Sequence, residues 1–172
     1  LPYVDEDRVG VTGGSQGAHA VNELCAAAFS ELSRELPNLR VIHQSGATDA
    51  ASLQERYAAA GIRAEATPFI RDMGAAYAQA DVVVCRAGAV TCAELCLCGV
   101  PAILIPLPSA ARDHQRLNAV ALLETGGAIL VNQQGISASD LCALLRELLG
   151  DAARRQAMST ALLKPATPHA DA

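Results

Sequence analysis

The chain has 172 residues, 51% of them hydrophobic, and its 13 lysines and arginines against 18 aspartates and glutamates leave a formal net charge of −5. A domain of this length buries roughly 70% of its unfolded surface, so the composition predicts one folded domain that needs no disulfide or metal. The acidic balance and an aromatic content of 3% disfavour nucleic acid as a partner. The apolar runs are far shorter than the roughly 20 residues that cross a bilayer, and no export signal opens the chain, so we expect a cytoplasmic location.

Short apolar segments typical of strands alternate along the chain with segments of helical length. The expected strands are residues 8–12, 39–43, 64–67, 82–85, 102–105 and 129–131, and the expected helices are residues 18–36, 52–60, 72–79, 91–98, 114–125 and 137–149. Apolar strands without polar alternation are typical of a parallel sheet that helices cover on both faces. The alternation therefore predicts a doubly wound, Rossmann-like α/β fold.

The two ends of the chain differ from this pattern. Residues 1–7 are interpreted as an interdomain linker, residues 8–155 as the folded domain, and residues 156–172 as a frayed tail rich in proline and alanine. The acidic run at residues 5–7 formally matches a metal-binding DxD motif, but its place before the first strand favours solvated charge. Cys92 and Cys96 stand one helical turn apart without a second pair at zinc-site spacing, so no metal is predicted.

A glycine-rich turn follows the first strand. Its candidate ligand-binding residues are Gly14, Ser15, Gln16, Gly17 and Ala18. Glycines let a backbone approach an anion, and the next helix adds free N–H groups, so a phosphate is the natural ligand. Glycines kept only for close packing are one alternative. A dinucleotide site is another, although the expected acidic residue after the second strand is replaced by His43 and Gln44.

The loop after the third expected strand contains the candidates Phe69, Ile70 and Met73. Backbone N–H and C=O groups beside the first two would suit the edge of a flat base. Taken alone, the segment equally indicates a helix start with Asp72 in its first turn.

A second small-residue turn follows the fourth expected strand, with the candidates Arg86, Gly88, Ala89, Val90 and Thr91. Two helix N-termini would then point at one crevice at the carboxyl edge of the sheet. Glu94 is placed to accept hydrogen bonds from ribose hydroxyls, with an ordinary helix-dipole carboxylate as the alternative.

The loop after the fifth expected strand leads into His114, Gln115 and Asn118. The two amides lie three residues apart on one helical face and suit sugar hydroxyls. The alternative is a helix that is merely capped by Asp113.

The succession GGSQGA, HQSG, FIRDM, CRAGAVTCAE, GVPAILIPLP and DHQRLNA, over about residues 8–149, resembles the MurG family. Those enzymes transfer N-acetylglucosamine from its UDP conjugate to lipid I in peptidoglycan synthesis. The resemblance implies the C-terminal, donor-binding half of a GT-B glycosyltransferase that inverts the anomeric centre and needs no metal or other cofactor. It also implies that the catalytic residue, the lipid I contacts and the membrane contact belong to an N-terminal half, and that the full-length protein is peripheral on the cytoplasmic face of the bacterial plasma membrane.

The resemblance also assigns roles to residues. Ser15 and the backbone of residues 14–18 would bind the diphosphate, Ile70 would pair its backbone with uracil, and Glu94 would hold the ribose. Residues 88–91 would line the phosphate and sugar side, and His114, Gln115 and Asn118 would contact N-acetylglucosamine; His19 departs from the arginine usual in the family. A stand-alone nucleotide-sugar module without catalysis and a dinucleotide-binding domain remain the alternatives.

Overall fold

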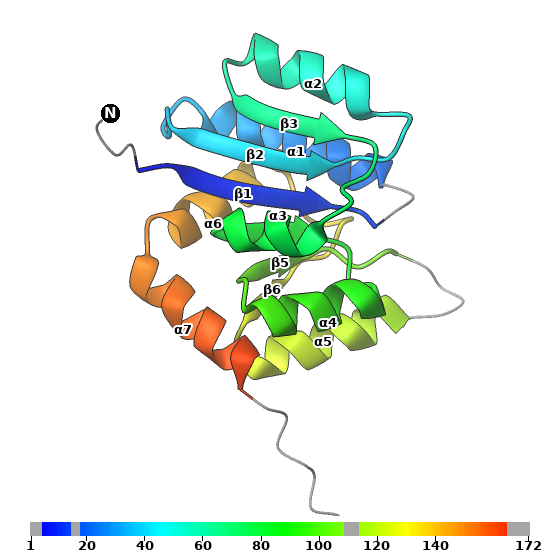
Figure 1. Cartoon of the computed structure of the whole chain (residues 1–172), viewed down its shortest axis with the longest axis vertical. Coiled ribbons are helices and arrows are strands. Elements are labelled where there is room, and N and C mark those ends of the chain that lie inside the picture. Colours follow the sequence, from blue (N-terminus) through cyan, green and yellow to red (C-terminus); the bar gives the residue numbers. More distant parts are fainter. Residues whose placement is uncertain (1–4, 15–17, 109–113, 165–172) are drawn as a thin grey trace, which may run out of the picture.

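The computed structural model describes residues 5–14, 18–108 and 114–164. Strands and helices alternate in the order β1 (Asp7–Thr12), α1 (His19–Leu32), β2 (Leu39–Gln44), α2 (Ala50–Ala59), β3 (Arg63–Thr67), α3 (Met73–Gln79), β4 (Val82–Cys85), α4 (Ala89–Cys98), β5 (Ala102–Leu104), α5 (His114–Thr125), β6 (Ala128–Leu130), α6 (Ala138–Leu149) and α7 (Ala152–Leu163). The six strands form one parallel sheet in the order β3-β2-β1-β4-β5-β6 (Figure 1). The predicted doubly wound α/β fold is confirmed, and its strand order reverses between β1 and β4, where such folds bind ligands.

The sheet separates two apolar layers, because successive residues of a strand point to opposite faces. Val82 and Val84 face the layer built with α1, α2 and α6, whose largest buried side chains include Phe29. Val83 faces the other layer, where α3, α4, α5 and α7 contribute side chains such as Leu95. Both layers meet at β4 and β5, which are buried along their whole length.

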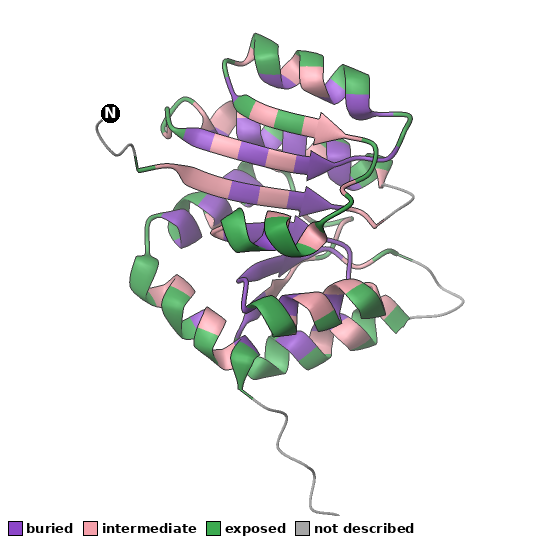
Figure 2. Cartoon of the chain, viewed as in Figure 1, coloured by how far each residue is buried: buried purple, intermediate pink, exposed green. Residues whose placement is uncertain are grey.

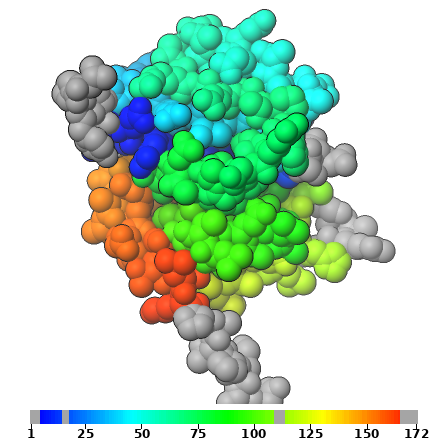
Figure 3. Space-filling view, in the orientation of Figure 1, coloured from blue at the N-terminus to red at the C-terminus, as the bar shows by residue number. Residues whose placement is uncertain are grey.

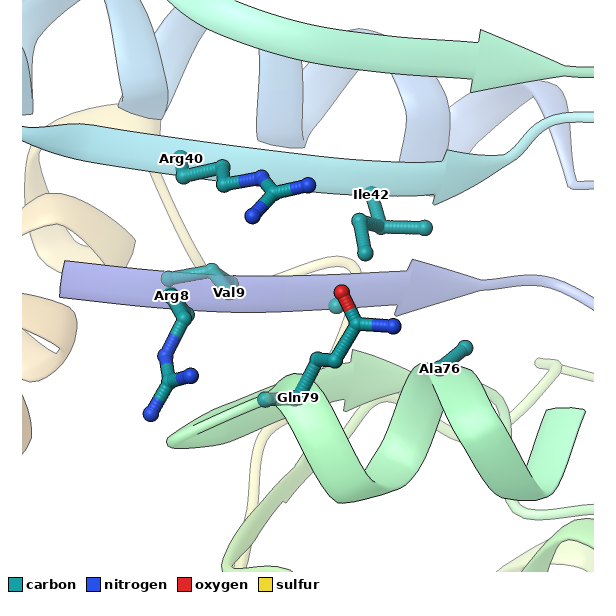
Figure 4. A pocket seen from close by; sticks show the side chains of 8 residues that line it. Arg8, Val9, Arg40, Ile42, Ala76 and Gln79 are labelled. Carbon is teal, nitrogen blue, oxygen red and sulfur yellow. The ribbon is translucent and has the colours of Figure 1, made fainter. Parts of the chain in front are cut away.

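The half of the sheet formed by β1, β2 and β3 is covered by helices on one face, and α3 covers only part of the other (Figure 2). Its other face carries Arg8 of β1, Arg40 and Ile42 of β2 and the exposed Arg63 of β3. The expectation that helices cover both faces holds only in part for these strands, because the seven-residue α3 reaches β1 and Ile42 of β2 and leaves β3 open. Figure 4 shows the edge of this open face, where a gap of about 10 Å³ between α3 and the strands has room for about one water molecule.

Ion pairs hold the beginning of the domain, so the acidic run is not simply solvated. Asp7 is the first residue of β1. The Glu6 carboxylate lies 2.9 Å from Arg63 Nη1 and 3.7 Å from Arg40 Nη1, and it thereby joins the starts of β2 and β3. The expected linker at residues 1–7 therefore ends earlier than predicted.

Helix α7 replaces the first part of the expected frayed tail. Asp151 caps it by accepting a hydrogen bond from the Arg154 N–H at 2.9 Å, and Met158 and Leu162 are buried. Figure 3 shows α7 lying against α4 at the surface. The sequence signal is weak because only these two buried side chains, one turn apart, mark an apolar face. No helix among the described residues is long and apolar enough to span a membrane.

Candidate functional site

A cleft of about 750 Å³ opens at the carboxyl edge of the sheet, where the strand order reverses. Its walls come from the ends of β1 and β2, the loop after β3, helix α3 and the start of α4. The lining residues are Thr12, Gly14, Gln44, Phe69, Ile70, Arg71, Asp72, Met73, Gly74, Tyr77, Gly88, Ala89, Val90, Thr91 and Glu94. A volume of this size is typical of small-molecule sites.

The cleft brings together most of the residues predicted for the nucleotide. Gly14, Phe69, Ile70, Met73, Gly88, Ala89, Val90, Thr91 and Glu94 all line it. Ala18, Arg86, His114, Gln115 and Asn118 do not belong to the lining. Ser15, Gln16 and Gly17 lie outside the described residues.

Helix α4 begins in the cleft lining and α1 is the helix that follows the glycine turn, and neither has a side-chain cap. The residues before α1 and α4 are Ala18 and Gly88, and neither has a side chain that bonds a helix N–H group. Helices α3, α6 and α7, by contrast, are capped by Asp72, Ser137 and Asp151. Uncapped helix N-termini carry free N–H groups and the positive end of the helix dipole, so these two starts suit an anion such as a diphosphate.

A carboxylate and a phenol meet across the cleft wall. Tyr77 of α3 donates its hydroxyl proton to Oε2 of Glu94 in α4, at 3.0 Å. Burial, followed by the nearby Glu94, raises the pKa of Tyr77, so the hydroxyl stays protonated and acts as a donor. The Tyr77 hydroxyl thus fixes the Glu94 carboxylate in the cleft lining, where it could accept hydrogen bonds from neighbouring hydroxyls of a ligand.

Gln44 at the end of β2 joins two walls of the cleft. Its Nε2 donates to Thr12 Oγ1 and to the Gly14 carbonyl, both at 3.0 Å. Its Oε1 accepts from the Ile70 N–H at 2.8 Å. Of the two Ile70 backbone groups predicted to pair with uracil, the N–H is thus already bonded, and the carbonyl has no hydrogen-bond partner among the described residues.

Residues 8–172 match the glycosyltransferase family 28 C-terminal domain. The chain belongs to this family. The family 28 domain is 44% identical over 163 residues to the UDP-N-acetylglucosamine–N-acetylmuramyl-(pentapeptide) pyrophosphoryl-undecaprenol N-acetylglucosamine transferase of Stutzerimonas stutzeri, covering 95% of this chain and 46% of that protein. Its identity to the enzyme of the same name from Syntrophotalea carbinolica is 46% over 152 residues, covering 88% of this chain and 42% of that protein.

The crystal structure of Acinetobacter baumannii MurG superposes on 93% of this chain with a TM-score of 0.79 and 35% sequence identity. The matched region is 45% of that chain. The family 28 domain therefore spans a little under half the length of the curated relatives and of this structure, and the resemblance to the MurG family is confirmed.

Arg86 of the family 28 domain, predicted to bind substrate, points away from the cleft. Its Nη1 donates to the carbonyls of Ile105 and Pro106, both at 3.3 Å, and to Gln133 Oε1 at 2.6 Å. The side chain is almost fully buried. The guanidinium therefore ties together the segments that follow β5 and β6, because a buried cation needs several acceptors.

The two amides predicted for the sugar are engaged with backbone in the family 28 domain. Gln115 Oε1 accepts from the Leu107 N–H at 2.9 Å, and Asn118 Nδ2 donates to the Ala87 carbonyl at 3.0 Å. Each amide thus holds a loop at the carboxyl edge of the sheet and retains its other polar atom for a ligand. His114 is exposed at the start of α5, and Asp113, considered as the alternative cap, lies outside the described residues.

A chain of hydrogen bonds joins α1 to β2, to α2 and to the segment before α2. His43 joins Tyr57 Oη through Nδ1 at 2.6 Å and Asn22 Oδ1 through Nε2 at 2.7 Å. Asn22 Nδ2 donates to Asp49 Oδ2 at 2.8 Å, and His19 Nδ1 reaches the same oxygen at 2.8 Å. The Asn22 amide donates its N–H groups to the Ser45 carbonyl and to Asp49, and its oxygen can only accept. His43 Nε2 therefore donates to that oxygen, and the neutral ring accepts the Tyr57 hydroxyl proton at Nδ1.

The sequence analysis did not predict Gln44 as a functional residue. It noted only that Gln44 stands where a dinucleotide site would have an acidic residue. Its signal was its position at the end of a strand beside the glycine turn. Arg71, Asp72, Gly74 and Tyr77 also line the cleft, and they sit within or beside the predicted base loop. Among the described residues no group of three or more His, Cys, Asp or Glu side chains is arranged to hold a metal ion.

Proposed function

We propose that this chain is the donor-binding half of a GT-B glycosyltransferase that transfers N-acetylglucosamine from UDP-N-acetylglucosamine to lipid I, forming lipid II. The names and identities of the curated relatives support this reaction. The observation that carries the proposal is the cleft itself, which is lined by Gly14 of the turn before α1, by the uncapped start of α4 and by Glu94. That set of groups suits a diphosphate and a ribose.

The donor would lie along the carboxyl edge of the sheet. Uracil would pack by Phe69 and the Ile70 backbone, ribose would bond Glu94, and the diphosphate would face the starts of α1 and α4. A sugar hydroxyl of lipid I would attack the anomeric carbon while UDP departs. The two helix ends would stabilise the negative charge that grows on the leaving diphosphate, because their N–H groups are oriented before the reaction begins.

The remaining parts of the reaction would belong to the rest of a longer protein. The curated relatives are more than twice as long as the segment matched here. We propose that this additional part supplies the catalytic base, the lipid I contacts and the attachment to the cytoplasmic face of the plasma membrane.

Calorimetric titration of the chain with UDP and UDP-N-acetylglucosamine tests donor binding. We expect both to bind and NAD not to bind. Glu94→Ala should weaken UDP binding by about 1 to 3 kcal/mol, because ribose hydroxyls lose a charged acceptor. The matched control is Glu65→Ala, which removes an exposed carboxylate of β3 outside the cleft lining and should leave the affinity unchanged. Absence of UDP binding, or tighter binding of NAD, would contradict the proposal.

A further inference from the structure

Tyr77 of helix α3 contacts Glu94, the residue proposed to bind the ribose. Its ring belongs to the buried layer that α3 and α4 share, and only 3% of the residue is exposed. Its hydroxyl reaches Oε2 of Glu94 at 3.0 Å. Oε1 of Glu94 has no hydrogen-bond partner among the described residues, and both side chains line the cleft.

The two side chains differ in freedom. A glutamate on a helix has several rotatable bonds, so an isolated carboxylate samples many positions and loses entropy when a ligand fixes it. The Tyr77 ring is held by packing, and its hydroxyl lies at a set distance from the helix that carries Glu94. A hydrogen bond from a fixed phenol therefore orders the carboxylate before any ligand arrives.

We propose that Tyr77 is a positioning residue that orders Glu94 for the two ribose hydroxyls and thereby sets the preference for ribonucleotides over deoxyribonucleotides. This inference rests on the proposed function, in which Glu94 binds the ribose. Tyr77 touches the carboxylate and acts through it. One carboxylate oxygen is held by the phenol, and the other is left to accept from the sugar.

The test compares UDP with 2′-deoxy-UDP by calorimetry. Tyr77→Phe removes one oxygen atom and keeps the ring, so the packing against α4 is retained. We expect UDP affinity to fall about three- to tenfold, the range for one ordinary hydrogen bond, because the Glu94 carboxylate itself is still present. The affinity for 2′-deoxy-UDP should fall less, because that ligand already lacks one of the two hydroxyls, so the preference for UDP should shrink.

Tyr57→Phe is the matched control. Tyr57 is also fully buried, and its hydroxyl bonds a side chain, His43, that lies outside the cleft lining. The same atom is removed from the same type of residue. We expect this variant to melt at a lower temperature while its preference for UDP over 2′-deoxy-UDP matches that of the wild type.

A second measurement separates positioning from a general effect on the cleft. In a Glu94→Ala background, Tyr77→Phe should change the preference by less than about twofold, because the group that it orders is gone. The inference would be overturned if Tyr77→Phe alone left the preference for UDP over 2′-deoxy-UDP unchanged. It would also be overturned if Tyr77→Phe reduced that preference as much in the Glu94→Ala background as in the wild type. A wild-type chain that binds no UDP would instead contradict the proposed function, so the two failures are distinguishable.

Discussion

His43 is a buried residue whose protonation state should affect folding between pH 4 and 7. Burial lowers its pKa to about 4, from an ordinary value of 6.5. The neutral ring accepts from Tyr57 and donates to Asn22, and protonation would place a positive charge in a site that is closed to water. The exposed His19 behaves in the opposite way, since its hydrogen bond to Asp49 raises its pKa.

These shifts predict the acid response of the free energy of unfolding. The contribution of His43 is complete above pH 6.5 and is lost as the pH falls toward about 4, because the unfolded chain takes up the proton first. The difference should reach about 2 to 3 kcal/mol. The contribution of His19 is present below pH 6.5 and is lost as the pH rises through its raised pKa.

Urea unfolding at pH 7 and pH 4.5 measures this effect. The control is His43→Gln, whose amide supplies the same acceptor and donor without titrating. This variant should be less stable at pH 7 and should lose less stability between the two pH values than the wild type. Because all other titrating groups are common to both proteins, equal losses would show that His43 does not carry the acid sensitivity.

Asn118 holds a loop and is also predicted to contact a ligand. Its side chain holds the Ala87 carbonyl, directly before Gly88 and the start of α4. A contact with N-acetylglucosamine through the remaining oxygen stays a prediction. The observed bond makes Asn118 part of the support for the phosphate side of the cleft as well.

At the scale of elements, the position of α7 depends on a glycine before β6. A Cβ atom at Gly127 would overlap the Leu162 side chain, which is itself 3% exposed and has no open space to move into. The absence of a side chain at this position therefore lets α7 approach the sheet closely. The sequence predicted a frayed tail from residue 156 and did not indicate this contact, because Gly127 and Leu162 are far apart in the sequence.

Gly127→Ala should consequently lower the free energy of unfolding by about 1 to 3 kcal/mol, the usual cost of overpacking. Gly135→Ala is the matched control, since its added Cβ would meet only the Asn132 carbonyl at 3.9 Å. That variant should stay within about 0.5 kcal/mol of the wild type. Equal thermal stability of the two variants would show that α7 yields to the added methyl group.

At the scale of the whole molecule, all residues of the proposed nucleotide-sugar cleft lie along one edge of one sheet. The segment matched here is 46% of one curated relative and 42% of another. In the GT-B architecture the donor lies between two domains, so this chain alone should bind UDP-N-acetylglucosamine without transferring its sugar.

Release of UDP in the presence of a lipid I analogue tests this expectation. The chain should show donor binding by calorimetry and no transfer above the rate of spontaneous hydrolysis. A full-length relative, such as the Stutzerimonas stutzeri transferase, provides the positive control in the same assay. Sustained transfer by this chain would show that it contains its own catalytic base and acceptor site.

The sequence by itself determined which segments become strands and helices up to α6, with α4 beginning two residues earlier than predicted. Apolar runs such as residues 82–85 and the glycine turn before α1 are local signals, and the structure places β4 at the predicted residues. Local signals also predicted most of the cleft lining, because in a parallel sheet the loops after the strands meet at one edge.

Tertiary structure decided the direction and the partner of each side chain. Arg86 follows β4 inside a predicted binding motif, yet its guanidinium bonds carbonyls after β5. Tyr77 meets Glu94 only because α3 packs beside α4, and one face of β3 stays open because the short α3 reaches only β1 and β2. These outcomes depend on residues that are distant in sequence and come together only when the sheet and its helices pack, so no local pattern contains them.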